Sequence, residues 1–299
     1  MSDTSVVGFI GLGQMGTPMV SHLLEAGFSV IAFDVSDAAV ASAAEAGATP
    51  AAAAADVAAR ARTIILMLPD SNVVERVVDD LAPGLAQGSV IIDMSSSEPA
   101  RTRQLAAGLA GRGVALIDAP VSGGVTAARA GTLTIMVGGD QEVVESVRPV
   151  LEAMGRIQLA GPVGAGHAVK ALNNLMSATH LWITSEAMIA AERFGLDVSA
   201  VLSIVNGSSG RSGSTENKWP NFVLPGTYDS GFRLRLMLKD MRIALALAEE
   251  LGAPSGLGAA AERFWSEAAD ALDEAADHTE VAAYLREADE TAREKEEAR

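Results

Sequence analysis

The chain has 299 residues, enough for two domains that each bury a core. It contains no cysteine, which excludes disulfides, thiolate catalysis and thiolate-bound metals. Its 22 basic and 38 acidic residues give a net charge of −16, which argues against nucleic acid and anionic membranes as partners, because both need a basic face. No apolar run reaches the roughly 18 residues of a membrane span, and no basic stretch precedes the N-terminal apolar run as in a signal peptide. The sequence therefore predicts a cytoplasmic protein.

Residues 6–34 have the pattern of a dinucleotide-binding unit. An apolar run predicts a strand over 6–10, and a helical pattern begins with the six residues that follow it, Gly11-Leu12-Gly13-Gln14-Met15-Gly16. A second apolar run ends at Asp34, about 20 residues after the glycines, as the dinucleotide fingerprint requires. A strand, a glycine turn, a helix and an acid in this order are much more specific than the glycines alone.

Each position in this unit has an expected role. Gly11 allows the tight turn out of the strand, Gly13 lets the backbone approach a pyrophosphate, and Gly16 lets the helix pack closely on the sheet. The pyrophosphate is expected at the helix N-terminus, where free N–H groups and the helix dipole favour an anion. Asp34 is expected to accept hydrogen bonds from the ribose hydroxyls and to repel a 2′-phosphate. Because Val35 follows it rather than an arginine, we predict NAD in preference to NADP.

Strand-like and helical segments continue to alternate after Asp34. Helical patterns cover 38–46 and a segment ending near Gly111, and the apolar runs that predict further strands lie at 63–68, 90–93, 114–118 and 133–137. Short apolar strands separated by helices predict a doubly wound, mostly parallel sheet.

From about residue 163 the pattern becomes helical. His167–Phe194 predicts one long helix without internal glycine or proline, and shorter helical patterns cover 198–205, 234–251, 259–276 and 280–288. Residues 206–231 form a Gly/Ser-rich connection of a length that is typical of functional or disordered loops. Residues 288–299 alternate in charge and predict a fraying tail. The chain is therefore expected to divide into a dinucleotide-binding domain over 1–163 and an all-helical domain over 164–299.

Two polar motifs could carry chemistry. Ser122, Gly123 and Gly124 follow a predicted strand, and their hydroxyl and backbone N–H groups suit a carboxylate, although an ordinary glycine turn has the same pattern. Lys170 and Asn174 share one face of the long helix, because they are four residues apart. A lysine partly removed from water has a lowered pKa and can exchange protons near neutral pH, whereas an isolated Lys/Asn pair is usually a solvated face.

The histidines point to no metal site, because they are scattered without ligand spacing. His167 lies close to Lys170 in the sequence. It is either an alternative base or a structural residue at the start of the helix.

The chain resembles the β-hydroxyacid dehydrogenases, a family that includes 3-hydroxyisobutyrate dehydrogenase and tartronate semialdehyde reductase. The resemblance extends from Val6 to about Leu285, and four segments carry it: Gly11–Gly16, Asp118–Gly131, Gly164–Asn174 and Lys239-Asp240. It implies a Rossmann domain joined to an all-α domain by a long interdomain helix. It also implies metal-free hydride transfer between NAD and a short 3-hydroxy acid or its semialdehyde.

The resemblance implies a role for individual residues. Lys170 is the expected catalytic acid/base, and Asn174 either holds the substrate oxygen or orients the lysine. The segment from Ser122 to Gly124 binds the substrate carboxylate. The remaining expected cofactor contacts are Leu68, Pro69, Ser96, Lys239 and Asp240. The family commonly has threonine where Ser96 stands, and the serine keeps the hydroxyl.

Several alternatives remain open at the level of sequence. One is a semialdehyde reductase acting on tartronate or succinic semialdehyde, and another is an imine reductase, although these typically lack the lysine at position 170. A decarboxylating enzyme like 6-phosphogluconate dehydrogenase would have a longer helical domain. A non-enzymatic NAD-binding protein would not need Lys170. The expected partners are a small carboxylate substrate and further copies of the chain in a homodimer or homotetramer, since the helical domain is rich in alanine and methionine.

Overall fold

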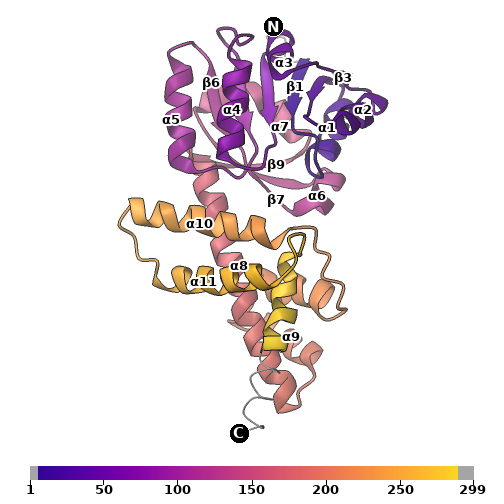
Figure 1. Cartoon of the computed structure of the whole chain (residues 1–299), viewed down its shortest axis with the longest axis vertical. Helices are drawn as coiled ribbons and strands as arrows, with labels where there is room; N and C mark the ends of the chain where they lie inside the picture. Colours follow the sequence, from indigo (N-terminus) through magenta and orange to yellow (C-terminus); the bar gives the residue numbers. More distant parts are fainter. Residues whose placement is uncertain (1–5, 289–299) are drawn as a thin grey trace. The chain divides into compact units, whose positions relative to one another are not determined.

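The structure is a computed structural model that describes residues 6–288 (Figure 1). The chain divides after Lys170 into two compact units. The charged segment 289–299, predicted as part of a fraying tail, lies outside the described residues. In the part of the chain that is described, no helix combines the length and the apolar character that crossing a membrane requires.

The first unit is built on a mostly parallel sheet. Its centre consists of five parallel strands in the order β2-β1-β4-β5-β6, which are β1 (Val6–Ile10), β2 (Ser29–Phe33), β4 (Thr63–Leu66), β5 (Val90–Asp93) and β6 (Ala115–Asp118). The short β3 (Thr49–Pro50) extends one edge in parallel. At the other edge β8 (Leu133–Gly138) runs antiparallel to β6 and β7 (Val121–Ser122), and β9 (Gly155–Gly161) pairs with β8 in parallel.

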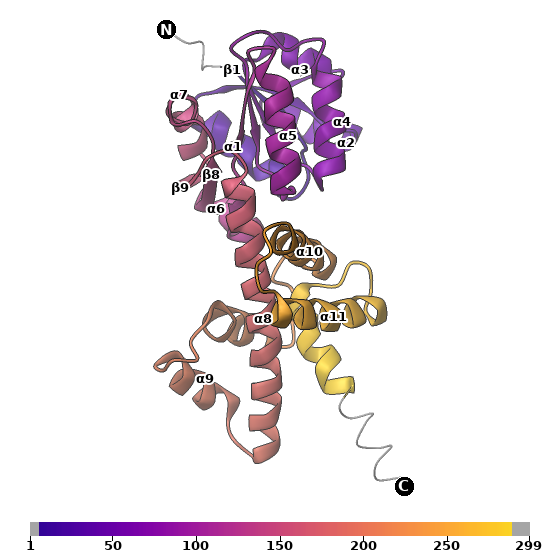
Figure 2. The ribbon, with the colours of Figure 1, turned by 90° about the vertical axis from the view of Figure 1, so that its left-hand side faces the viewer.

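Helices cover both faces of this sheet, and each face has its own core. One core contains apolar residues of α1 (Gly16–Glu25), α2 (Asp37–Glu45), α6 (Gly124–Ala130) and α7 (Gln141–Glu152). The other contains residues of α3 (Ala54–Arg60), α4 (Ser71–Leu81) and α5 (Pro99–Ala110), which lie together on one side of the sheet in Figure 2. Successive strand residues point to opposite faces, so Phe9 belongs to the first core and Ile10 to the second. Burial on both faces explains why these strands are continuous apolar runs.

The carboxyl ends of the central strands are in register. Ile10 pairs with both Phe33 and Leu66, Leu66 pairs with Asp93, and Asp93 pairs with Asp118. The residues that follow these five positions therefore lie along one edge of the sheet. The strand order changes direction between β1 and β4, and ligands of doubly wound sheets bind at such a switch point.

The second unit is helical, as predicted. The long helix α8 (Ala165–Phe194) begins in the first unit and continues into the second, where Figure 2 shows α9 on one side of it and α11 on the other. The other elements are α9 (Val198–Asn206), η1 (Ser214–Val223), α10 (Leu234–Glu250), α11 (Gly256–Ala271) and η2 (His278–Glu280), after which residues 281–288 are helical. Trp219 and Trp265 are fully buried in its core, and Trp182 stacks on Phe264 with ring centroids 5.4 Å apart. The fold class predicted from the sequence is confirmed.

Two details of the second unit differ from the sequence prediction. The connection predicted over 206–231 contains a π-helix, Ser214–Val223, because Trp219 and Val223 lie four residues apart and are buried in the core. The Gly/Ser-rich flanks hide this spacing in the sequence. The helix predicted over 259–276 ends at Ala271, where the backbone becomes extended at Leu272. The side chain of Asp273 then accepts a hydrogen bond from the Ala275 N–H and forms a turn.

Candidate functional site

Two of the three fingerprint glycines are required by the fold itself. Gly11 has φ +101°, and a Cβ there would overlap the carbonyl oxygen of Met67. A Cβ at Gly16 would overlap the carbonyl oxygen of Gly11. These contacts match the turn and the close helix packing that the sequence predicts at the two positions.

Gly13 has no such explanation within the chain. It is exposed, its φ lies outside the left-handed region, and a Cβ there would meet no atom within 4 Å. A glycine in open space is expected where the backbone must admit a ligand closely, and the neighbouring α1 N-terminus is suited to an anion. The loop therefore fits a dinucleotide, whose pyrophosphate Gly13 and the N–H groups at the start of α1 would hold.

Asp34 follows β2 and is hydrogen-bonded to the glycine loop. Its Oδ2 accepts a hydrogen bond from Leu12 N at 2.6 Å, and its Oδ1 accepts one from Ser36 N at 2.8 Å. Val35 is 94% exposed. No Lys, Arg or His occurs between Asp34 and Arg60. Asp34 thus has no basic residue close after it in the sequence.

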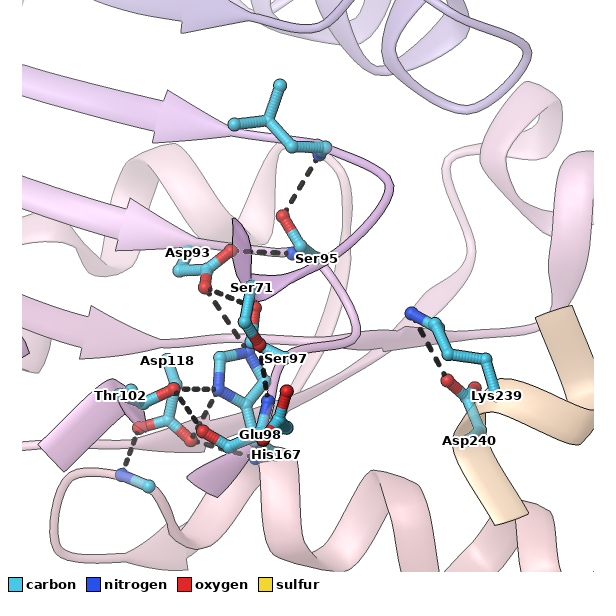
Figure 3. Close-up of polar contacts among 12 residues, drawn as sticks. Ser71, Asp93, Ser95, Ser97, Glu98, Thr102, Asp118, His167, Lys239 and Asp240 are labelled. Carbon is cyan, nitrogen blue, oxygen red and sulfur yellow. Dashed lines mark hydrogen bonds and ion pairs between the residues drawn. The ribbon is translucent and has the colours of Figure 1, made fainter. Parts of the chain in front are cut away.

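The loops after β4 and β5 are joined by hydrogen bonds (Figure 3). Leu68 N donates to Ser95 Oγ at 2.9 Å, and Ser95 N donates to Asp93 Oδ1 at 3.0 Å. Ser97 Oγ donates to Asp93 Oδ2 at 2.7 Å. The predicted cofactor contacts Leu68, Pro69 and Ser96 therefore belong to two loops that the buried Asp93 organises.

The predicted carboxylate-binding segment lies where β7 passes into α6. Gly123 has φ +121° and Gly124 has φ +65°, so both adopt conformations that other residues rarely reach. A Cβ at Gly123 would overlap Ala127, whereas one at Gly124 would meet nothing within 4 Å. Gly123 is exposed, and Ser122 is half-buried. The backbone at this turn is thus open to a small ligand.

The start of α8, which carries Lys170, is held by Asp118 at the end of β6. Asp118 Oδ1 accepts a hydrogen bond from Gly164 N at 2.6 Å, and Oδ2 accepts one from His167 N at 2.8 Å. The carboxylate therefore caps free N–H groups of a helix whose own first turn has no acidic residue. Burial raises the pKa of Asp118, and His167 together with these backbone hydrogen bonds opposes that rise. A Cβ at Gly166 would overlap Met136 O, so the helix can begin at this place only with glycine there.

Lys170 lies one turn after His167 and is 8% exposed. The side chain of His167 is itself fully buried, and its Nδ1 lies 2.9 Å from Thr102 Oγ1. This burial removes His167 from contact with a substrate in solution, and the alternative hypothesis that it acts as the base is not supported.

The three site residues of the second unit also lie together. Asn174, 4% exposed, donates from Nδ2 to Asp240 Oδ2 at 2.6 Å. Lys239 Nζ lies 3.4 Å from Asp240 Oδ1. Lys170 and Asn174 are four residues apart on the same continuous helix. The cofactor contacts predicted for Lys239 and Asp240 stay predictions.

The sequence reading missed the buried polar residues around His167. The sequence does contain a signal for these residues, because Asp93 and Asp118 each end one of two consecutive apolar strands. No cluster of metal-binding side chains occurs among residues 6–288.

Two protein-family models together match residues 6–285 of the chain. Residues 6–164 match the NAD binding domain of 6-phosphogluconate dehydrogenase, and residues 164–285 match the NAD-binding domain of NADP-dependent 3-hydroxyisobutyrate dehydrogenase. The chain is thus an NAD(P)-binding protein in both parts.

Individual relatives agree with these matches. The chain is 39% identical over 269 residues to 2-(hydroxymethyl)glutarate dehydrogenase of Eubacterium barkeri, covering 89% of each chain. It is 40% identical over 265 residues to NAD-dependent L-serine dehydrogenase of Pseudomonas aeruginosa, covering 85% of this chain and 89% of the relative.

A solved structure of 3-hydroxyisobutyrate dehydrogenase from Mycobacterium tuberculosis, described with L-serine, superposes with a TM-score of 0.89 at 33% identity. The match covers 94% of this chain and 99% of that one. The resemblance drawn from the sequence motifs is confirmed. The chain belongs to the β-hydroxyacid dehydrogenases, a family of oxidoreductases that act on CH–OH donors.

Proposed function

We propose that this protein oxidises the primary alcohol of a short 3-hydroxy acid to its semialdehyde with NAD. The named substrates of the relatives support the choice, because 2-(hydroxymethyl)glutarate, L-serine and 3-hydroxyisobutyrate are all HOCH2–CHR–COO⁻ and differ only in R. The observation that carries the proposal is the placement of Lys170. It is a buried lysine on a helix whose first turn Asp118 attaches to the strand edge that bears the dinucleotide fingerprint.

The bound cofactor supplies the acceptor for the hydride that leaves the hydroxyl-bearing carbon. Lys170 supplies the proton chemistry: its neutral amine takes the hydroxyl proton as the C–H hydride departs, and its ammonium returns a proton to the carbonyl oxygen in the reverse direction. The C–H and O–H bonds break and the C=O bond forms, so the substrate loses two electrons and two hydrogens. The ammonium also stabilises negative charge that develops on the oxygen.

The Ser122–Gly124 turn is proposed to bind the substrate carboxylate. Its positive-φ glycines hold the backbone open, and the Ser122 hydroxyl adds a donor beside it. Fixing the carboxylate there would place the carbon two bonds away at a constant distance, which selects 3-hydroxy over 2-hydroxy acids.

NAD is proposed in preference to NADP, because Asp34 is expected to face the ribose and no Lys, Arg or His lies between Asp34 and Arg60. A cytoplasmic location is also proposed. Nucleic acid and membranes are not proposed as partners, since the net charge is −16.

Self-association is proposed to involve α8. Leu172, Met176 and Ile183 are 44%, 59% and 54% exposed, and their spacing puts them near one face of the helix. No Asp, Glu, Lys or Arg occurs from 171 to 185, so a second copy of this acidic chain would meet no like charge there. A homodimer or homotetramer buries such apolar patches.

The alternatives use the same residues differently. A semialdehyde reductase would run the same chemistry in reverse, with Lys170 as the acid. An imine reductase would act on a C=N substrate and would not need a carboxylate turn at Ser122. A non-enzymatic NAD sensor would bind NADH without turnover.

The test is NADH formation with a panel of purified short acids. We expect turnover with 3-hydroxyisobutyrate, L-serine or another HOCH2–CHR–COO⁻ acid, and none with the 2-hydroxy isomers. Reduction of semialdehydes without measurable oxidation of the alcohols would favour the reductase. NADH binding without turnover in either direction would contradict the proposal and favour the sensor.

A further inference from the structure

Three buried titratable side chains of the first unit have no part in the proposed proton chemistry. Asp93, His167 and Asp118 come from the end of β5, the first turn of α8 and the end of β6, and their exposures are 1%, 1% and 0% (Figure 3). Burying two carboxylates is unfavourable unless their charge is compensated and their oxygens are hydrogen-bonded. A buried cluster with this energetic cost is expected to have a structural role, such as fixing one element of the fold relative to another.

His167 is the centre of this cluster. Its backbone N–H donates to Asp118 Oδ2 at 2.8 Å, its Nδ1 lies 2.9 Å from Thr102 Oγ1, and its Nε2 lies 3.7 Å from Asp93 Oδ2. Thr102 Oγ1 also lies 3.1 Å from the Glu98 carbonyl oxygen, to which it donates its single proton. Nδ1 must therefore be the donor to Thr102.

The Nε2 atom of His167 lies on the side of Asp93. Among the described residues it has no partner within hydrogen-bonding distance. It lies 3.7 Å from Asp93 Oδ2, so the histidine ring stands beside the Asp93 carboxylate. His167 thus links Asp93 to Asp118 and Thr102.

Asp93 extends the link to the loops expected to hold the cofactor. It accepts hydrogen bonds from Ser95 N and Ser97 Oγ, on the two sides of Ser96. Ser95 Oγ in turn accepts the hydrogen bond of Leu68 N in the neighbouring loop. Hydrogen bonds therefore join Leu68, Ser95 and Asp93. The 3.7 Å approach of Asp93 to His167 extends this polar path to the turn of α8 that precedes Lys170.

We propose that His167 is a positioning residue, which through Asp93 and Asp118 fixes Lys170 relative to the cofactor-binding loops after β4 and β5. This inference rests on the proposed function, in which the lysine must meet a substrate oxygen beside the cofactor. Lys170 lies three residues after His167, about 4.5 Å along the helix, so any shift of the first turn is passed on to it. Displacements of about 1 Å in such geometry are enough to slow a reaction by about 100-fold.

The first experiment compares the protein with His167→Asn. The asparagine amide can replace Nδ1 at Thr102, but it is too short to replace Nε2 opposite Asp93. We expect kcat to fall about tenfold or more, while KM for NAD and the affinity for NADH change by less than about threefold. In the cofactor-free protein, we expect faster hydrogen exchange at Leu68 N, which lies at the far end of the path.

Val147→Ala is the matched control. Val147 is buried in α7 of the same unit and belongs to the core on the other side of the sheet from α5. Its truncation lowers the thermal midpoint through a cavity, without touching the path. We expect it to leave kcat and the exchange of Leu68 N unchanged.

Ser97→Ala serves as a milder second variant if His167→Asn fails to fold. It removes one donor to Asp93 Oδ2 and leaves the histidine in place. We expect a smaller loss in kcat and faster exchange at Leu68 N. Wild-type kcat and wild-type exchange in a folded His167→Asn or Ser97→Ala protein would overturn the inference. The inference would also be overturned if Val147→Ala had the same thermal midpoint as His167→Asn and lost as much kcat.

Failure of the proposed function would give different results from failure of this inference. In that case the wild-type protein would itself not oxidise any acid of the panel. The exchange of Leu68 N would still report on the path in the cofactor-free protein, and faster exchange in His167→Asn would still support the link between His167 and the cofactor loops.

Discussion

Asn174 donates a hydrogen bond of 2.6 Å from Nδ2 to Oδ2 of Asp240, and both side chains are buried. Because a carboxylate only accepts, this bond fixes which way the amide points. The Oδ1 atom of Asn174 then accepts a hydrogen bond from Asn173 Nδ2 at 3.1 Å and retains a second lone pair. Asp240 therefore sets the orientation of the Asn174 amide within the helical unit.

Asp240→Asn tests this arrangement. The new amide can present either its oxygen or its nitrogen to Asn174, so the fixed orientation is lost. We expect kcat to fall by about tenfold with little change in NADH affinity, as for a misplaced catalytic group. Steady-state kinetics and NADH titration check this, and Asn173→Ala, which removes an exposed donor, is expected to have a much smaller effect. An Asp240→Asn enzyme with wild-type kcat would assign Asp240 to folding alone.

Replacement of Lys170 should separate chemistry from binding. Lys170→Ala removes the proton donor and acceptor, and we expect turnover to fall by about 100- to 10,000-fold. NADH affinity, measured by fluorescence titration, should remain within a few-fold of wild type. Lys170→Arg keeps a positive charge but cannot give up its proton near neutral pH, so it should be nearly as slow. Full turnover by either variant would contradict the assignment of Lys170.

The glycine loop offers a test in which two similar changes have opposite consequences. Gly13→Ala adds a methyl group in open space, so we expect a stable protein with weakened NADH binding, by about tenfold or more. Gly16→Ala drives a methyl group into the Gly11 carbonyl, so we expect loss of stability before any specific effect on binding. Thermal midpoints and NADH titrations distinguish the two. Unchanged NADH affinity in Gly13→Ala would show that the cofactor does not approach this residue.

Much of the fold and of the candidate site could be predicted from the sequence. The sequence predicts the βαβ unit through Asp34 and the strands at 90–93 and 133–137. It does so because buried parallel strands are short apolar runs and glycines mark their turns. A methyl group at Gly16 would overlap Gly11 O and crowd Phe9 of β1, in agreement with the close packing predicted at this position.

Other features depend on contacts between distant residues, which a single sequence does not reveal. The cap that Asp118 provides for α8 joins residues 46 and 49 positions apart. The π-helix over Ser214–Val223 forms because Trp219 is buried by elements elsewhere in the chain. The family resemblance singles out Lys239 and Asp240 together, but it does not reveal the hydrogen bond of Asp240 with Asn174, 66 positions away.

Cofactor preference should depend on Asp34 more than on Val35. Val35→Arg alone leaves the carboxylate in place to repel a 2′-phosphate, so we expect NADH to remain preferred. Asp34→Ser combined with Val35→Arg removes the repulsion and adds a phosphate partner, so we expect the preference to move toward NADPH by about 100-fold or more. The ratio of kcat/KM for the two cofactors is the measurement. Asp34→Ser alone is the control for loosening of the glycine loop, since Leu12 N loses its acceptor.

Asp277 should make the stability of the helical unit depend on pH. Its Oδ1 accepts hydrogen bonds from Thr279 N and Oγ1 at 2.9 and 2.6 Å, and its Oδ2 accepts them from Gly231 N and Phe232 N at 2.9 and 3.1 Å. Burial alone would raise the pKa of Asp277, but His278 and Thr279 outweigh it and hold the pKa well below its usual value.

Because the pKa of Asp277 is lower in the folded than in the unfolded state, its ionised form stabilises the fold above the unfolded pKa of about 4. That contribution decreases as the pH falls through the range between the two pKa values. We expect Asp277→Asn to reduce the free energy of unfolding by roughly 1–3 kcal/mol at pH 7, because donors that now face the carboxylate lose their acceptor. The difference from wild type should shrink below about pH 4, where unfolded Asp277 protonates. Urea unfolding at both pH values checks this, with the exposed Asp229→Asn as the matched change of charge. A deficit in Asp277→Asn that is the same at pH 7 and pH 3 would show that the carboxylate charge has no part in holding residues 230–232 against 277–279.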